Sequence, residues 1–297
     1  MSDNNTNSEK NIFLNENLSK YSWFNVGGKA DLFFKPNSIS ELSKFLNNNK
    51  LKPENVTIIG AGSNTLIRDR GVKGTTIKLS SSFSYVKLIN ENTIEAGAST
   101  FDKKVSDFAK ENSISGLEFL SCIPGGIGGA VRMNCGCYGG EISQILHSIN
   151  VMDLKGQEKE IMGNEINFYY RGSNLDKNLI ILSAKFKGVV KEKKEIEEKQ
   201  NDLVLKKKNS QPSQVKTCGS TFKNPEKNKA WKLIKESECQ NLSVGSASIS
   251  DKHCNFFVNN GNASATDIEQ LIEKVKNKVL LNKGIKLELE IRIIGEK

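Results

Sequence analysis

The chain has 297 residues, enough for two or three domains with sizeable cores. Its proportions of charged residues (26%) and hydrophobic residues (37%) are those of ordinary soluble proteins, and no apolar run approaches the ~20 residues that span a bilayer. The net charge of +9 suits anionic ligands such as nucleotides, nucleic acid or acidic lipids, although a lysine-rich surface without a partner explains it equally well.

Residues 1–18 are polar and predict a flexible tail. They contain no apolar core of the kind that a signal peptide requires, so we expect a cytoplasmic protein. In that compartment the six cysteines stay reduced.

Hydrophobic periodicity predicts a mixed chain in which short strands alternate with a few helices. Predicted helices cover 38–48, 101–111, 191–208, 230–236 and 265–281. Predicted strands cover 32–35, 56–59, 76–79, 85–89, 93–96, 145–153, 158–161, 167–173, 180–190, 246–249, 256–258 and 286–294. Thr266 lies where an N-cap is expected for the last helix, and Gly284 is its stop. The helix over 191–208 alternates Lys with Glu, as a solvated face with (i, i+4) pairs does, and the turn at 209–212 predicts a domain boundary.

The strand at 56–59 runs into a small-residue loop, Gly-Ala-Gly-Ser-Asn-Thr-Leu, at 60–66. A dinucleotide fingerprint would need glycine where Thr65 stands, and Gly71 ends any helix that might follow, so a Rossmann fold is disfavoured. The amides and hydroxyls of this loop suit a pyrophosphate, and a plain turn is the alternative.

A second glycine-rich run, Ile-Pro-Gly-Gly-Ile-Gly-Gly-Ala, occupies 123–130. Pro124 favours the first turn of a helix, whose amides would face an anion as a phosphate cradle. The alternative is a tight helix that packs on a sheet through its glycines.

Metal and thiol chemistry have little support in the sequence. Only His147 and His253 are present, and the pair Cys135 and Cys137 has no second pair at zinc spacing, so we expect no metal site. The cysteines best fit small apolar spaces, and no Cys–His pairing indicates a nucleophile.

Ser220 follows Gly219 in a loop that Pro225 stiffens, so its hydroxyl is a candidate proton donor. The alternative is an ST-turn in which the serine caps its own loop. A serine donates a proton only beside a stabilised anion, and Arg171 and Glu290 are candidates for that support. A surface ion pair and an ordinary strand residue are the alternatives for these two.

An ordered set of motifs along the chain resembles the UDP-N-acetylenolpyruvoylglucosamine reductase family. The motifs are SWFNVGGKAD at 22–31, GAGSNTL at 60–66, IPGGIGGAVRMN at 123–134 with YGGE at 138–141, YRGS at 170–173, GSTFKNP at 219–225 and EIRIIG at 290–295. No long tyrosine-bearing insertion is present, which resembles the shorter second type of the family. The chain departs from the common pattern at Lys216-Thr217-Cys218.

The resemblance implies an α+β fold with a noncovalent FAD-binding unit of the vanillyl-alcohol-oxidase (PCMH) type at 22–190. This unit would have subdomains at about 22–80 and 81–190, and a C-terminal α+β domain at 205–297 would bind a UDP-sugar. The implied FAD contacts are Gly60, Ala61, Gly62, Ser63, Asn64, Thr65, Leu66, Ile123, Pro124, Gly125, Gly128, Gly129 and Ala130.

The implied reaction forms UDP-N-acetylmuramate for peptidoglycan: NADPH reduces FAD, and hydride then passes to C3 of the enolpyruvyl group. Ser220 would protonate C2, while Arg171 and Glu290 stabilise the enolic intermediate. The implied substrate contacts are Tyr170, Asn224, His253 and Asn255. A monomer without metal, nucleic acid or membrane partners is expected. The alternatives are another flavin oxidoreductase of this fold and a non-catalytic binding protein whose charge serves nucleic acid.

Overall fold

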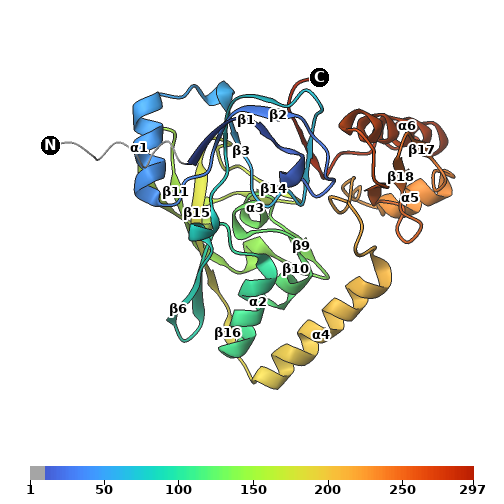
Figure 1. Ribbon diagram of the computed structural model, residues 1–297. Helices are drawn as coiled ribbons and strands as arrows, with labels where there is room; N and C mark the ends of the chain where they lie inside the picture. The colour runs from blue at the N-terminus through green and yellow to red at the C-terminus, as the bar shows by residue number, and fades with distance from the viewer. Residues whose placement is uncertain (1–10) are drawn as a thin grey trace. The chain divides into compact units, whose positions relative to one another are not determined.

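The computed structural model describes residues 11–297, and these divide into two compact units (Figure 1). The described part of the first unit comprises residues 11–14, Leu32–Ala61 and Gly74–Lys207. The second comprises Asn15–Asp31, Gly62–Lys73 and Lys208–Lys297. Two N-terminal segments thus cluster with the C-terminal residues, which the linear boundary near 190–205 does not anticipate. The functional domains at 22–190 and 205–297 stay predictions.

The helices lie where the periodicity predicts them, and a further short helix, α3, begins within the second glycine-rich run, where a helix is also expected. They are α1 (Ile39–Asn49), α2 (Asp102–Glu111), α3 (Ile127–Arg132), α4 (Lys193–Ser210), α5 (Ala230–Glu236) and α6 (Ala265–Lys283). Helix α3 begins after Gly126 and not at Pro124, so the expectation that Pro124 opens the first helical turn is wrong. Of the predicted (i, i+4) pairs, Asp202–Lys206 lies within α4, and Lys191–Glu195 joins a residue just before α4 to its first turn.

The strands are short, and many have only two or three residues. In the first half of the chain they are β1 (Ile12–Asn17), β2 (Lys29–Phe34), β3 (Val56–Ile58), β4 (Thr65–Ile67), β5 (Val72–Ile77), β6 (Val86–Asn90), β7 (Thr93–Gly97), β8 (Ile114–Ser115), β9 (Gly136–Cys137), β10 (Gly140–Glu141) and β11 (Leu146–Met152). The remainder are β12 (Glu158–Met162), β13 (Phe168–Tyr169), β14 (Gly172–Ser173), β15 (Ile180–Lys187), β16 (Val189–Val190), β17 (Ser243–Val244), β18 (Ala247–Ile249), β19 (Phe257–Asn259) and β20 (Arg292–Ile294).

The first unit is built on a five-stranded antiparallel sheet with the order β12-β11-β15-β7-β6. The central strand β15 is buried over almost its whole length and contributes side chains to two cores. Ile181 and Phe186 join the core that also contains apolar residues of α2 and α3. Ile180 and Leu182 join the core formed with α1, which lies beside β11 and β15 in Figure 1. The sheet is therefore covered by helices, which its apolar central strand requires.

Strand β1 includes residues that the sequence placed in the flexible tail. Ile12–Asn17 pairs in a four-stranded sheet of order β1-β2-β5-β3, and Asn11 accepts a backbone hydrogen bond from Lys35 (2.9 Å). The apolar residues of β1 do not alternate with polar ones, so the sequence pattern does not predict a strand there. Only the pairing with its neighbour in the sheet identifies β1 as a strand. Residues 1–10 of the predicted tail lie outside the described residues.

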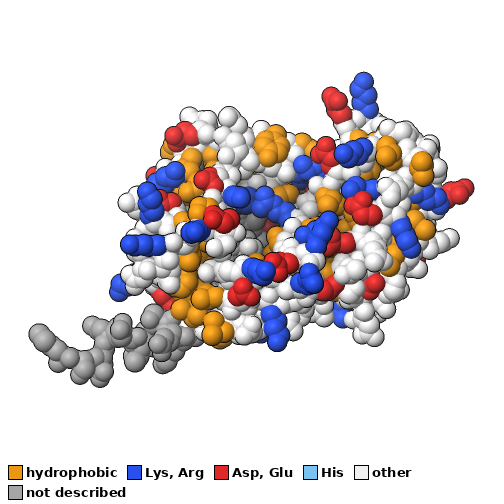
Figure 2. All heavy atoms as spheres, turned by 90° about the horizontal axis from the view of Figure 1, so that it is seen from above, with side chains coloured by type: hydrophobic (Ala, Val, Ile, Leu, Met, Phe, Trp, Pro, Cys, Tyr) orange, Lys and Arg blue, Asp and Glu red, His pale blue; other side chains and the backbone are white. Residues whose placement is uncertain are grey.

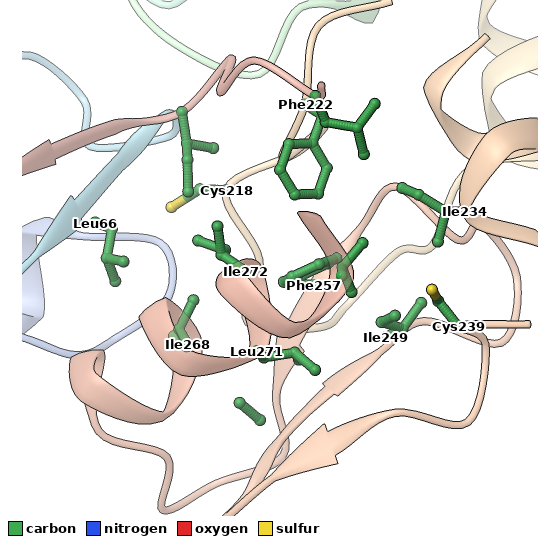
Figure 3. Close-up of a cluster of buried hydrophobic side chains, with 14 of the residues drawn as sticks. Leu66, Cys218, Phe222, Ile234, Cys239, Ile249, Phe257, Ile268, Leu271 and Ile272 are labelled. Carbon is green, nitrogen blue, oxygen red and sulfur yellow. The ribbon is translucent and has the colours of Figure 1, made fainter. Parts of the chain in front are cut away.

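The second unit packs α5 and α6 with the sheet β17-β18-β19 around one core. Leu66, Cys218, Phe222 and Phe257 point toward the apolar face of α6 in this core (Figure 3). The Phe222 and Phe257 rings meet edge to face with centroids 5.8 Å apart, a favoured aromatic geometry. The core thus ties β4, the Ser220 loop and the C-terminal helix together.

The alternation over 286–294 predicts one continuous strand, and this prediction is wrong for most of its length. Only Arg292–Ile294 forms β20, which pairs in parallel with the equally short β4. Upstream, Leu289 makes an isolated bridge to Phe222. Because a strand extends only as far as its partner, local alternation overstates its length.

The N-cap of helix α6 lies two residues before the position expected from the sequence. The Ser264 hydroxyl accepts from the amide of Asp267 (3.0 Å), so Ser264 and not Thr266 is the N-cap. Asp69 adds a second cap from a distant segment: its carboxylate accepts from the amides of Ala265 (2.8 Å) and Thr266 (2.9 Å). These bonds satisfy amide groups that the helix itself leaves without partners.

We therefore expect Asp69→Ala to lower the free energy of unfolding by about 1 kcal/mol at pH 7. Burial raises the pKa of Asp69, but the bonds from Thr266 and Ala265 outweigh it, so the pKa lies below its ordinary value. A depressed pKa stabilises the folded state above the unfolded pKa, about 3.9, and the contribution disappears as pH falls further. Urea unfolding at pH 7 and pH 3 tests this, with the exposed Asp251→Ala as control. Equal losses at both pH values would contradict the carboxylate cap.

No helix within residues 11–297 is long and apolar enough to cross a membrane.

Candidate functional site

The loop at 60–66 contains two glycines whose surroundings differ. A Cβ on Gly62 would lie 1.8 Å from the carbonyl oxygen of Tyr21, and its φ is +74°, so the fold itself demands glycine there. A Cβ on Gly60 would meet nothing within 4 Å. Packing therefore explains Gly62, whereas Gly60 borders open space that is suited to a ligand.

Lys78 lies against the same loop within the first unit. Its ammonium group donates a short hydrogen bond to the carbonyl oxygen of Gly60. Burial, with a further contribution from the nearby Lys35, lowers the pKa of Lys78 to about 8. This places positive charge beside Gly60, a feature that the sequence analysis missed because Lys78 follows β5, a separate segment of the chain.

Asn64, Thr65 and Leu66, also predicted to contact FAD, belong to the second unit. The Asn64 side chain donates to the carbonyl oxygen of Glu290 (3.0 Å), and its own carbonyl accepts from the amide of Arg292 (2.9 Å). Thr65 and Leu66 belong to β4, and the Leu66 side chain is fully buried in the core (Figure 3). A ligand at Leu66 can therefore meet only its main chain.

The second glycine-rich run, Ile123–Ala130, packs against the segment that joins β7 to α2. The amides of Ile127 and Gly128 donate to the carbonyls of Thr100 and Ala98 (both 3.0 Å), so they are not available to an anion. A Cβ on Gly128 would lie 3.2 Å from that of Ala98, which supports close packing there. At Gly129, by contrast, a Cβ would meet nothing within 4 Å. Packing thus explains Gly128, whereas Gly129 borders open space.

Asp102 is an unusual neighbour of this run. It is fully buried, and neither carboxyl oxygen has a hydrogen-bond partner, while its amide donates to the carbonyl of Gly125 (3.2 Å). Burial raises the pKa of Asp102 well above its ordinary value, which favours the neutral form of the carboxyl group. An orphaned polar group beside this glycine-rich run fits a cofactor site, as does the Lys78 charge beside Gly60.

Tyr170 and Arg171 form the turn between β13 and β14. Arg171 has a φ of +56°, its guanidinium carbon lies 4.8 Å from the centre of the Tyr170 ring, and Nη2 donates to the carbonyl of Gly136 (2.6 Å). A Cβ on Gly172 would lie 2.2 Å from the Tyr169 ring, so the turn needs glycine. The arginine is therefore oriented by an aromatic face and by β9, as a preorganised charge would be.

Ser220 is half-buried on a loop with anchored flanks. Gly219 has a φ of +77°, and Cys218 and Phe222 on either side are buried in the core (Figure 3). Ser220 itself makes a β-bridge with Phe256. This arrangement fixes the backbone on both sides of the hydroxyl.

Asn255 supports the Ser220 loop through its side chain. Its Oδ1 accepts from the amide of Phe222 (3.0 Å), its Nδ2 donates to the carbonyl of Phe222 (2.8 Å), and its own carbonyl accepts from the Thr221 amide (2.8 Å). The side chain is 3% exposed. The structure thus places Asn255, expected at the substrate, in a buried supporting position.

Glu290 lies on the other side of the same loop. Its amide donates to the carbonyl of Thr221 (2.9 Å), and its carbonyl accepts from Asn64, as described above. The structure thereby brings the main chains of Ser220, Glu290 and Asn64 together within the second unit, although they are far apart in sequence. The buried Thr221 hydroxyl, at their junction, has no hydrogen-bond partner.

His253 and Asn224 have local structural roles. The His253 ring lies between Trp231 and Phe256, with centroids 6.4 and 4.8 Å away, and its Nδ1 accepts from the amide of Asn255 (3.2 Å). Burial lowers the pKa of His253, so it is neutral at pH 7. The Asn224 side-chain oxygen accepts from the amide of Ala230 at the start of α5 (3.0 Å).

Metal ligation has no structural basis in residues 11–297, where no group of three or more His, Cys, Asp or Glu side chains could hold an ion.

Two family models match consecutive parts of the chain. An FAD binding domain matches residues 30–162, and the C-terminal domain of UDP-N-acetylenolpyruvoylglucosamine reductase matches residues 211–294. The predicted α+β fold with an FAD-binding unit and a separate C-terminal domain is confirmed by these matches and by the structural likeness reported next.

The chain is also similar to whole proteins. A UDP-N-acetylenolpyruvoylglucosamine reductase of Pelagibacter ubique (strain HTCC1062) is 47% identical over 95% of this chain and 94% of that protein. One from Wolbachia sp. subsp. Drosophila simulans (strain wRi) is 43% identical over 94% of each. The crystal structure of the Thermus caldophilus reductase matches with a TM-score of 0.83 and 31% identity, over 96% of this chain and 98% of that one. With such identity over nearly the whole of each relative, the chain belongs to the UDP-N-acetylenolpyruvoylglucosamine reductase family.

Proposed function

We propose that Ser220, Arg171 and Glu290 carry the reaction of this FAD-containing, NADPH-dependent oxidoreductase, which reduces the enolpyruvyl group of UDP-N-acetylenolpyruvoylglucosamine to give UDP-N-acetylmuramate. The observation that best supports these roles is the hydrogen bond between the Glu290 amide and the Thr221 carbonyl, because it sets Glu290 beside the Ser220 loop. Arg171 belongs to the first unit, and Ser220 and Glu290 to the second.

Bound FAD would supply the hydride that it has received from NADPH. The chain's own residues then have to manage charge and protons on the substrate. When C3 gains hydride, negative charge develops over C2 and the adjacent carboxylate. The planar guanidinium of Arg171 matches two oxygens of that group, and its stacking on Tyr170 holds the plane in one orientation.

Ser220 would hold the proton that C2 receives. Its hydroxyl is a weak acid, so transfer depends on a nearby carbanion-like centre that is a stronger base. The bridge to Phe256 and the Asn255 bonds to the adjacent main chain fix the loop that carries it. Glu290 would bind the enolic intermediate while its main chain remains tied to Thr221 and Asn64.

The residues around Gly60, Lys78 and Gly129 would hold the FAD noncovalently. Support comes from the open space at both glycines and from the Lys78 ammonium at Gly60, since a pyrophosphate needs close backbone approach and positive charge. Asn224 and His253 lie in the second unit with Ser220, where the resemblance expects substrate contacts.

A substitution at Gly129 separates an effect on FAD binding from an effect on the stability of the fold. Gly129→Ala should raise the stability of the apoprotein by up to about 1 kcal/mol, because alanine favours the helical conformation that this exposed residue already has. The added methyl group should weaken FAD binding about tenfold if the cofactor packs there. Thermal unfolding and flavin fluorescence quenching measure the two effects, with Lys194→Ala on α4 as control. Unchanged FAD affinity would remove Gly129 from the cofactor site.

We further propose a cytoplasmic monomer that does not bind nucleic acid. On the face drawn in Figure 2, Lys and Arg side chains are interspersed with Asp and Glu, so the charge there forms no single-sign stripe. Size-exclusion chromatography with light scattering measures the molar mass and tests the monomer. Salt-dependent binding of an oligonucleotide in a gel-shift assay would contradict the proposal that the protein does not bind nucleic acid.

The direct test of the function is the visible spectrum of the purified holoenzyme under anaerobic conditions. Flavin absorbance should bleach on addition of NADPH and return only on addition of UDP-N-acetylenolpyruvoylglucosamine. Bleaching without recovery would point to another acceptor and overturn the proposed substrate.

A further inference from the structure

The turn that carries Arg171 lies at the tip of a very short hairpin. Strands β13 and β14 have two residues each and form a sheet of their own. The side chains of Tyr169 and Tyr170 are 58% and 44% exposed, so the hairpin has little apolar anchorage. An isolated two-stranded hairpin is only marginally stable in water. Contacts from outside the hairpin must therefore hold Arg171 in one position.

The segment 132–136, at the end of α3, supplies such contacts, and Figure 1 draws α3, β9 and β14 close together. Hydrogen bonds run from the Ser173 hydroxyl to the carbonyl of Arg132 (3.1 Å), from Asn134 Nδ2 to the carbonyl of Tyr169 (3.3 Å) and from Arg171 Nη2 to the carbonyl of Gly136 (2.6 Å). The first and third bonds end on main-chain carbonyls of the segment. The second bond depends on the side chain of Asn134.

The backbone of Asn134 is fixed by the end of α3. Its amide donates to the carbonyl of Val131 (3.1 Å), and the amide of Cys135 donates to the carbonyl of Ala130 (2.9 Å). Asn134 has a φ of +44°, so these bonds form the Schellman arrangement that commonly ends a helix. Asparagine adopts this left-handed conformation more readily than most residues with a side chain. The glycine-rich helix thus sets the position from which the Asn134 side chain reaches the hairpin.

The Asn134 side chain is 1% exposed and bonds to two separate segments. Its Oδ1 accepts from the amide of Ser143 (2.9 Å) in the 3₁₀ helix Ile142–Gln144, and its Nδ2 donates to the carbonyl of Tyr169. A main-chain amide can only donate and a carbonyl can only accept, so these partners allow a single orientation of the side-chain amide. A carboxylate would lack the donor, and an apolar side chain would lack both groups.

We propose that Asn134 is a positioning residue for Arg171: its side chain fixes the hairpin so that the guanidinium meets the negative charge that develops on the substrate. Because Asn134 is buried, it acts through Arg171 and not on the substrate, and its role therefore rests on the function proposed above for Arg171. A displacement of about 1 Å in an active site can cost about 10²-fold in rate. Since other bonds to the hairpin remain, we expect the loss of this one to cost about tenfold.

Two substitutions remove the contact in different ways. Asn134→Asp keeps the acceptor for Ser143 but sets a carboxylate oxygen against the Tyr169 carbonyl. Asn134→Gly removes the side chain but keeps the end of α3, since glycine is favoured at this position, so it tests the proposal even if the first variant folds poorly. Asn112→Asp is the matched control, because the Asn112 side chain likewise donates to a main-chain carbonyl, that of Phe108 (2.8 Å), at the end of α2.

Anaerobic stopped-flow absorbance of the FAD-loaded variants measures the effect on each half-reaction. Both Asn134 variants should be reoxidised by the enolpyruvyl substrate about tenfold more slowly than the natural chain. Their reduction by NADPH, and both half-reactions of Asn112→Asp, should stay within about twofold of the natural rates. Natural reoxidation rates in both Asn134 variants would overturn the proposal, and so would equal slowing of the two half-reactions, which indicates a general loss of structure.

A double-mutant cycle shows whether Asn134 acts through Arg171. In Arg171→Ala, which has no guanidinium to orient, each Asn134 substitution should change the reoxidation rate by less than about twofold. A further loss of about tenfold in that background would show that Asn134 acts independently of Arg171 and would overturn the positioning role. Reoxidation of Arg171→Ala by itself at the natural rate would instead refute the proposed function of Arg171, and the positioning role with it.

Amide hydrogen exchange of the FAD-loaded protein measures the positioning without turnover. Peptides that cover residues 168–173 should exchange about tenfold faster in both Asn134 variants than in the natural chain, whereas peptides of α6 should be unchanged. Unchanged exchange of the hairpin in both variants would show that Asn134 does not hold it, which would also overturn the proposal.

Discussion

Replacement of Ser220 by alanine is expected to slow reoxidation of the reduced enzyme by its enolpyruvyl substrate by about 10²–10⁴-fold, the usual contribution of a positioned proton donor. Reduction by NADPH should stay within about twofold, since this half-reaction needs no proton at C2. The small change leaves the loop intact, because Gly219 and the Asn255 bonds that fix it do not involve the Ser220 side chain.

Anaerobic stopped-flow absorbance measures the two half-reactions separately. Ser243→Ala is the matched control, since Ser243 is an exposed serine of β17 in the same unit. If Ser220→Ala is reoxidised at the natural rate, Ser220 acts only as the turn residue that its sequence context also allows.

Arg171→Lys is expected to lower the rate of substrate reduction by about 10²–10³-fold, as the loss of one oriented donor does at other oxyanion sites. Lysine keeps the charge but cannot stack as a plane on Tyr170 or present two parallel donors to a carboxylate. The positive φ of 56° strains the unbranched side chains of arginine and lysine to a similar degree, so the substitution changes the chemistry more than the backbone.

The half-reaction with NADPH again serves as an internal reference, and Arg70→Lys is a control at an exposed arginine. A larger KM with an unchanged rate at saturation would assign Arg171 to substrate binding alone. An unchanged rate and KM would show that the arginine only braces β9 through Gly136.

Local sequence patterns predicted the elements that depend on local physics. The spacing of apolar residues predicted α1 and α6 because a helix buries one face every 3.6 residues, and Gly284 was recognised as the stop, where φ is +66°. The β20 prediction failed because strand length depends on a partner, β4, that is far away in the chain.

The sequence by itself determined the helices, the family and the candidates Arg171, Ser220 and Glu290, because periodicity and ordered motifs are properties of neighbouring residues. Only the tertiary structure decided that Gly62–Lys73 clusters with the C-terminal residues and that Asn255 supports the Ser220 loop. It also distinguished Gly62, which packing requires, from Gly60 and Gly129, which border open space. Such relations join residues far apart in sequence, and the contacts that create them depend on how the whole chain packs.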